Sequence, residues 1–189
     1  KNYVIGGEES FGLMMGDQIR DKDAVSAVAL LCEMAAYEKA QGRTLFDKLI
    51  ELYIQYGFYK EDLISITKKG MDGQQQIAAM MEAYRKNPPT VINGVAVAQL
   101  LDYELQKGTN IQDGSQWDIQ LPKSNVLQFI LADGSIISAR PSGTEPKIKF
   151  YFSVKEQLES AADFDKVNVQ LDEKIKAILD RPAQYPEYG

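Results

Sequence analysis

The sequence predicts a chain in two parts, the end of a three-layer α/β/α domain followed by an α+β domain with an antiparallel sheet and two helices. Three observations indicate this fold class. One short apolar run precedes two helical patterns before residue 57. Asp133-Gly134 separates two apolar runs, which is a strong signal for a β-hairpin. Apolar and polar residues then alternate over 147–154, ahead of a long helical pattern.

Residues 1–57 are expected to form a strand at Tyr3–Ile5, a glycine-hinged loop and two helices. Apolar residues recur at three- and four-residue steps over Asp23–Ala40, which predicts the first helix. Thr44 and Asp47 have the spacing of a capping box at the start of the second. One strand and two helices cannot close a core. We therefore expect their apolar faces to pack on each other, to pack on a neighbouring molecule, or to stay partly mobile.

Residues 58–189 are expected to form a second, complete unit around its own core. Met80 and Met81 are predicted to pack in that core rather than to form a binding surface. Trp117 is predicted to anchor a loop by packing rather than to stack on a sugar. The elements expected in this unit are a strand at 63–67, a helix from Asp72 to Lys86 that Pro88 and Pro89 stop, an extended segment over 91–101, a region that is mainly loop over 107–123, the hairpin of 126–139, and a helix over 156–180.

Composition excludes several classes of protein. The 189 residues carry a formal net charge of −6, which argues against a nucleic-acid-binding surface. We find no apolar run long enough to span a membrane. The single cysteine, Cys32, cannot form an internal disulfide, and its apolar neighbours predict a buried thiol on a helix. The absence of a disulfide framework fits a reducing, cytoplasmic compartment.

The segment RPSGTEPK, residues 140–147, combines the groups that bind an anion. Arg140 offers a planar fork of donors to two phosphate oxygens. Ser142 and Thr144 add hydroxyl donors, Lys147 adds charge, and Gly143 lets the backbone turn with a positive φ and approach a ligand. The segment lies between two predicted strands, which would hold both of its ends. The alternative is a solvated turn in which Arg140 pairs with Glu145 and nothing binds.

A second polar segment, GGEESFG at 6–12, follows the first predicted strand. The carboxylates of Glu8 and Glu9 and the hydroxyl of Ser10 can hydrogen-bond to sugar hydroxyls. The run RDKD at 20–23 follows shortly afterwards. The alternative is a polar turn and a helix N-terminus with an aspartate cap.

The order GEESFG, GDxIRDKD, RPSGTEPK resembles the C-terminal part of the α-D-phosphohexomutases, most closely the phosphoglucomutase and phosphomannomutase branch. The resemblance covers essentially the whole chain. It implies a four-domain enzyme that interconverts hexose 1-phosphate and hexose 6-phosphate by phosphoryl transfer from a phosphoserine, through a bisphosphate such as glucose 1,6-bisphosphate. It also implies that residues 1–57 end the third, sugar-binding α/β domain. Residues 58–189 would then form a terminal α+β domain of the TATA-binding-protein-like shape, without DNA binding.

The resemblance also implies roles for single residues. Glu8 and Ser10 would bind the sugar hydroxyls, and Lys22 would be a candidate general acid or base, which requires a lowered pKa. The phosphate that is not being transferred would be held by Arg140, Ser142, Gly143, Thr144 and, more weakly, Lys147.

Two features of that family are missing from the sequence. We find no TASHNP-like serine loop and no DGDxDR-like metal loop, and the chain contains no histidine. We therefore expect the C-terminal fragment of a longer enzyme, which binds substrate but is inactive alone. Mg²⁺ would be bound outside this fragment, whose partners would be a phosphosugar and the missing N-terminal domains. The alternative is a non-catalytic phosphosugar-binding module. The motifs do not separate glucose from mannose or pentose substrates.

Overall fold

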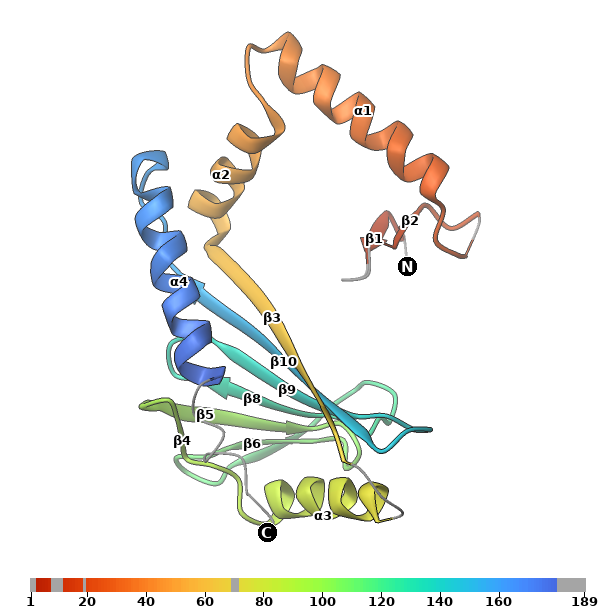
Figure 1. Ribbon diagram of the computed structural model, residues 1–189, viewed down its shortest axis with the longest axis vertical. Helices are drawn as coiled ribbons and strands as arrows, with labels where there is room; N and C mark the ends of the chain where they lie inside the picture. Colours follow the sequence, from red (N-terminus) through yellow and green to blue (C-terminus); the bar gives the residue numbers. More distant parts are fainter. Residues whose placement is uncertain (1–2, 8–11, 19, 69–71, 180–189) are drawn as a thin grey trace. The chain divides into compact units, whose positions relative to one another are not determined.

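The computed structural model describes residues 3–7, 12–18, 20–68 and 72–179 of the chain. The chain divides into two compact units, Lys1–Gln55 and Tyr56–Gly189. Figure 1 shows the elements of both units.

The first unit holds a two-stranded ladder followed by two helices. Strand β1 (Ile5–Gly7) pairs antiparallel with β2 (Leu13–Met15), and the hydroxyl of Tyr3 donates a hydrogen bond to the carbonyl of Met14 at 3.1 Å. The strand predicted at Tyr3–Ile5 therefore begins later than expected, and β2 was not predicted at all. Tyr3 packs closely over Gly6 of β1, and a Cβ at position 6 would meet the tyrosine hydroxyl.

Both helix starts agree with the sequence. Helix α1 (Ala24–Ala40) is capped by the carboxylate of Asp23, which accepts hydrogen bonds from the amides of Val25 and Ser26 at 3.0 Å each. Helix α2 (Leu45–Tyr56) begins with a reciprocal capping box. The amide of Thr44 donates to Asp47 Oδ2 at 2.7 Å, and the amide of Asp47 donates to Thr44 Oγ1 at 3.1 Å.

The predicted burial of Cys32 is wrong, because its side chain is exposed on α1. Val25 is 79% exposed and Leu31 is 52% exposed on the same helix. Apolar residues surround α1 on nearly all sides, so their three- and four-residue steps did not identify one buried face. Within the described part of this unit, two strands of three residues each cannot cover a helix of 17 residues.

The second unit is an antiparallel sheet covered by two helices, as predicted. The strands lie in the order β3-β10-β9-β8-β5-β6-β7, and β4 pairs with β5 outside this path. Helix α3 (Gly73–Lys86) follows β3, and helix α4 (Phe164–Leu179) follows β10. The strands are β3 (Phe58–Thr67), β4 (Val91–Ile92), β5 (Val95–Asp102), β6 (Lys107–Asn110), β7 (Gln116–Asp118), β8 (Leu127–Leu131), β9 (Ile136–Pro141) and β10 (Lys147–Glu156).

The core lies between one face of this sheet and the two helices. Every second residue of β10 is buried, and Ile148, Phe150, Phe152 and Val154 are each at most 1% exposed, as the alternation predicted. Met80 and Met81 of α3 are buried as well, at 4% and 1% exposure, which confirms their expected place in the core. The ring of Tyr84 meets the rings of Phe129 and Phe150 edge to face, at centroid distances of 5.7 and 6.4 Å.

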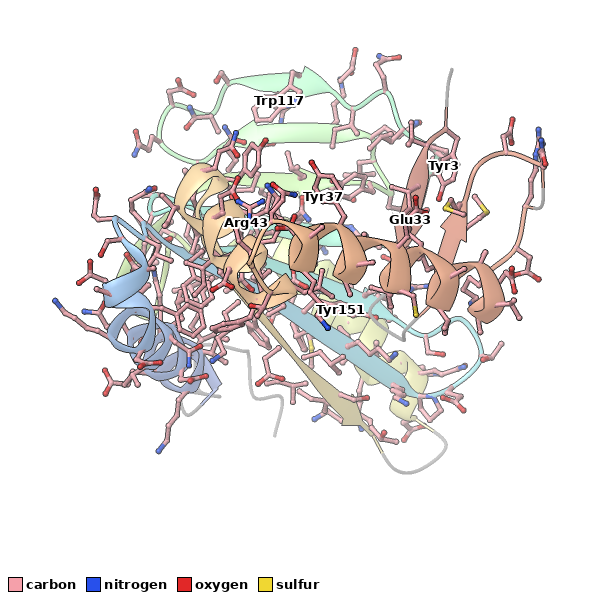
Figure 2. All side chains as sticks on the ribbon, turned by 90° about the horizontal axis from the view of Figure 1, so that it is seen from above. Tyr3, Glu33, Tyr37, Arg43, Trp117 and Tyr151 are labelled. Atoms are coloured by element: carbon pink, nitrogen blue, oxygen red, sulfur yellow. The ribbon has the colours of Figure 1, made fainter. Side chains whose placement is uncertain are left out.

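Three elements differ from the predictions. The region 107–123, expected to be mainly loop, forms β6 and β7, where Trp117 packs on Gly108 at the edge of the sheet (Figure 2). Gly108 permits this because any side chain would collide with the indole. Strand β3 begins at Phe58 instead of Leu63, since all ten of its residues pair with β10 and this pairing outweighs the charges at 60–62. The last helix begins at Phe164, because β10 continues to Glu156 and a 3₁₀ turn (Ala161–Asp163) comes before the helix.

The turn of the β8–β9 hairpin is tied to α4 through a charged cluster. Lys174 Nζ lies 2.8 Å from Asp133 Oδ2 and 2.9 Å from Glu156 Oε1. Partial burial by itself raises the pKa of Asp133, but the hydrogen bonds from Lys174 and from the Ser135 amide outweigh it and hold that pKa below its usual value. Burial by itself lowers the pKa of Lys174. The carboxylates of Asp133 and Glu156 outweigh this effect, so the pKa of Lys174 is raised.

The charged cluster predicts a stability difference that depends on pH. The Asp133 carboxylate has a lower pKa in the folded chain than in the unfolded chain, so its contribution is complete above about pH 4 and is lost as the pH falls through the folded pKa. Asp133→Asn should therefore lower the melting temperature at pH 6, and the gap from wild type should close as the pH falls through the lowered pKa of Asp133. Glu173→Gln, which changes one exposed carboxylate on α4, is the matched control. A gap that stays constant with pH would contradict the role given to Asp133.

Candidate functional site

The 140–147 loop closes the β9–β10 hairpin at the end of two strands whose register is set by the core. Arg140 lies directly opposite Lys149 in the antiparallel pair. The amide of Ser142 donates to the carbonyl of Lys147 at 2.8 Å, which continues the ladder into the loop. Because Ile148 and Phe150 face the core, Lys147 and Lys149 face the opposite side of the sheet.

A pocket of about 290 Å³ lies at this loop. Four of the predicted phosphate-binding residues line it, namely Arg140, Ser142, Gly143 and Lys147. The fifth, Thr144, is exposed but does not line the pocket. Pro141, Glu145 and Lys149 complete the lining.

The pocket holds three cations with little local compensation. Within the residues that the structure describes, the side chains of Arg140 and Lys147 make no ion pair or hydrogen bond. The alternative arrangement, an ion pair of Arg140 with Glu145, is therefore not formed. Lys149 Nζ lies 6.0 Å from the centroid of the Tyr151 ring. Like charges directly opposite each other destabilise a sheet, and a bound anion would remove that penalty.

The sequence predicts that Lys149 contributes, with Arg140 and Lys147, to the positive charge at this loop, but Lys149 was not among the residues predicted to bind the phosphate directly. Alternation over 147–154 places Lys147 and Lys149 on the same face of β10. Lys149 lies at the pocket because it pairs with Arg140. Only the register of the two strands establishes this pairing.

The loop holds its shape differently from what was expected. Gly143 does not have a positive φ, so the predicted left-handed turn at this position is wrong. The hydroxyl oxygen of Ser142 instead accepts hydrogen bonds from the amides of Thr144 and Glu145, at 3.4 and 3.3 Å. A Cβ at position 143 would have no atom within 4 Å, so this glycine leaves open space beside the pocket. The Ser142 hydroxyl can still donate its proton to a ligand.

The first unit contains a second pocket, also of about 290 Å³, with both apolar and charged residues in its lining. Lys22 lines this pocket together with Arg20 and Asp21. Arg20 pairs with Asp17 at 3.0 Å, and the aliphatic part of the Lys22 side chain packs closely over Gly12. Tyr3, Gly6, Gly7, Gly12 and Met14 form the remaining walls. The predicted sugar-binding residues Glu8 and Ser10 lie outside the described residues.

The described residues contain no group of three or more histidine, cysteine, aspartate or glutamate side chains placed to hold a metal ion. None of the helices in this part of the chain has the length and apolar character needed to cross a membrane.

Comparison with known proteins identifies relatives of both units. The family model described as phosphoglucomutase/phosphomannomutase, alpha/beta/alpha domain III, matches residues 1–56, and the model for the C-terminal domain of the same family matches residues 71–171. A phosphoglucomutase of Staphylococcus haemolyticus (strain JCSC1435) is 40% identical over 154 residues, which is 82% of this chain and 28% of that protein. A phosphoglucomutase of Staphylococcus aureus (strain MRSA252) is 37% identical over 179 residues, which is 95% of this chain and 31% of that protein.

One solved structure supports the fold. The exocytosis-sensitive phosphoprotein pp63/parafusin (phosphoglucomutase) from Paramecium, in its open form, has a TM-score of 0.53 and 19% sequence identity to this chain. The match covers 90% of this chain and 30% of that one. With the two family models, it bears out the predicted combination of the end of an α/β/α domain with an α+β domain. The chain spans 28–31% of the length of the two curated relatives.

The facing cations predict opposite effects on stability and on binding. Lys149→Gln removes the like charge opposite Arg140, so the ligand-free chain should become more stable by a few tenths of a kcal/mol at low salt. The same change should weaken phosphate binding. Melting temperatures at low and high salt and a phosphate titration measure the two effects. Lys166→Gln, an equal charge change on the exposed face of α4, should produce neither. A Lys149→Gln chain that is less stable and binds phosphate normally would contradict the assignment.

Proposed function

The chain belongs to the phosphoglucomutase/phosphomannomutase family, and we propose that it forms the sugar- and phosphate-binding part of a longer phosphohexomutase. The complete enzyme would be an isomerase that interconverts hexose 1-phosphate and hexose 6-phosphate. It would do so through a bisphosphate intermediate such as glucose 1,6-bisphosphate.

One observation carries this proposal. Arg140 and Lys149 face each other across two paired strands, on a pocket that also contains Lys147 and Ser142. A dianionic phosphate would compensate the repulsion between the two facing cations. The guanidinium can bind two phosphate oxygens at once, whereas each lysine acts as a compact charge. We therefore add Lys149 to the proposed phosphate-binding set of Arg140, Ser142, Gly143, Thr144 and Lys147.

In the proposed reaction, the 140–147 loop holds the phosphate that is not being transferred. Phosphoryl transfer depends mainly on positioning and charge stabilisation, so a fixed distant phosphate would orient the reacting end of the sugar. The loop contacts phosphate without contacting a particular carbon of the sugar. It can therefore accept either phosphate of a bisphosphate after the intermediate has turned around. Glu8 and Ser10 would set the orientation of the sugar ring.

Lys22 is the proposed general acid or base. It lines the pocket of the first unit together with Arg20 and Asp21. A neutral amine would accept a proton as a general base, and the ammonium would donate one as a general acid. A positively charged Lys22 could instead stabilise negative charge on the transferred phosphoryl group.

The remaining components of the enzyme would lie in other parts of the longer protein. Mg²⁺ would neutralise charge on the transferred phosphoryl group, and we propose that acidic residues outside this chain hold it. Those other domains and a phosphosugar would be the partners of this chain. A reducing, cytoplasmic compartment is proposed from the cysteine content. A non-catalytic phosphosugar-binding module is the alternative, and the sequence around this chain in the longer protein distinguishes the two.

The experiment that tests this function is a titration of the chain with inorganic phosphate and with glucose 1-phosphate, followed by amide signals of residues 140–149. Arg140→Ala should weaken binding by about tenfold or more, because one charged hydrogen bond contributes about 1.5–3 kcal/mol. Arg140→Lys keeps the charge but loses the planar fork, so its affinity should fall between those of wild type and Arg140→Ala. In the complete enzyme, Arg140→Ala should lower kcat/KM by about tenfold or more.

Two results would refute the phosphate-binding role. One is a wild-type chain whose 140–149 signals stay unchanged at millimolar phosphate. The other is an Arg140→Ala chain that binds phosphate as tightly as wild type. Lys166→Ala, the control change away from the pocket, should also leave the phosphate affinity unchanged.

A further inference from the structure

The first residue of α3 lies in unusually close contact with the 140–147 loop. Gly73 is buried, and a Cβ at this position would stand 2.6 Å from the carbonyl oxygen of Lys68 and 2.9 Å from Cβ of Pro146. Neither neighbour is the end of a flexible side chain. Lys68 contributes a backbone atom, and Pro146 belongs to a rigid ring.

Both neighbours of Gly73 are anchor points of the loop. The amide of Lys68 donates a hydrogen bond to the carbonyl of Pro146 at 2.9 Å, just beyond the pairing of Thr67 with Lys147. The amide of Lys147 in turn donates to the carbonyl of Glu145 at 2.7 Å. A displacement at Pro146 therefore moves the backbone that carries two residues lining the pocket, Glu145 and Lys147.

Helix α3 cannot move away to relieve a collision at its first residue. Ile77, Met80 and Met81 are buried against the sheet at 4%, 4% and 1% exposure. At the other end of the helix, Arg85 forms an ion pair with the buried Asp102 at 2.9 Å. An added side-chain atom at position 73 would thus shift the loop rather than the helix.

We propose that Gly73 is a positioning residue for phosphate binding. By lacking a side chain it allows α3 to support the loop at Pro146 and so places Lys147 and Arg140 for one anion. This inference rests on the phosphate-binding function proposed for the loop. Gly73 contacts no ligand itself, and it does not line the pocket.

The test compares three variants of the full 189-residue chain. Gly73→Ala adds the colliding atom. Gln74→Ala changes the exposed neighbouring residue of the same helix turn. Ile77→Ala weakens the packing of α3 one turn further along without adding an atom near the loop. For each variant we would measure the melting temperature, the amide signals of the ligand-free chain and the affinity for inorganic phosphate at a temperature where the variant is folded.

We expect Gly73→Ala to shift the ligand-free signals of Lys68, Ser142 and Lys147, and to raise the Kd for phosphate by about threefold or more. Gln74→Ala should do neither, and Ile77→Ala should lower the melting temperature without changing the Kd. A folded Gly73→Ala chain with unchanged loop signals and Kd would overturn the inference. So would an Ile77→Ala chain whose Kd rises equally, because stability alone would then explain the effect.

If Gly73→Ala does not fold, phosphate binding to the wild-type chain tests the inference. Coupling is reciprocal, so phosphate should shift the amide signals of residues 73–75 and slow their hydrogen exchange although they lie outside the pocket. Unchanged signals there, with shifted signals at 140–149, would overturn this inference but leave the phosphate-binding function intact. A wild-type chain that binds no phosphate would overturn both.

Discussion

The pairing of β10 with β9 on one side and with β3 on the other is the interaction on which the candidate site depends. Ile148, Phe150 and Phe152 are almost fully buried, so every intervening residue must face the opposite side of the sheet. A slip of one residue would place Lys147 and Lys149 in the core. The hydrophobic core therefore determines where the cations of the pocket lie, and the order of residues in the loop determines which donors surround them.

The site also shows a conflict between local stability and binding. Arg140 and Lys149 lie opposite each other across the strand pair, and like charges in such positions destabilise a sheet. Arg140 forms no ion pair with any residue that the structure describes. Such an arrangement persists only where the surrounding core supplies enough stabilisation. Lys174, Arg85 and Lys60 of the same unit, in contrast, each pair with at least one carboxylate. Arg140, Lys147 and Lys149 thus bring three cations without an ion pair among the described residues to one pocket, at the loop that has the composition of an anion site.

Much of this fold could be predicted from local sequence patterns. The Asp133-Gly134 turn, the alternation over 147–154 and the caps at Asp23 and Thr44 all act over a few residues, and the structure confirms them. The errors arose where the pairing of one strand with its neighbour decides the structure. Strand β2 exists because β1 lies opposite, and the indole of Trp117 on β7 needs Gly108 of β6 beneath it. The charge of Lys149 near the loop was expected, but its place in the lining of the pocket follows from its pairing with Arg140. The exposure of Cys32 shows that periodicity identifies apolar positions, not what covers them.

The register between β3 and β10 has a consequence for how the protein folds. Thr67 pairs with Lys147, so one end of the loop is supported by a strand that comes much earlier in the chain. Closing such a long segment costs chain entropy before any contact rewards it, which makes non-local strand pairing slow. The hairpins β8–β9 and β9–β10 join neighbouring segments, so their formation needs no such closure. The residues of the pocket can therefore come together locally, whereas their support by β3 depends on the slower, non-local pairing.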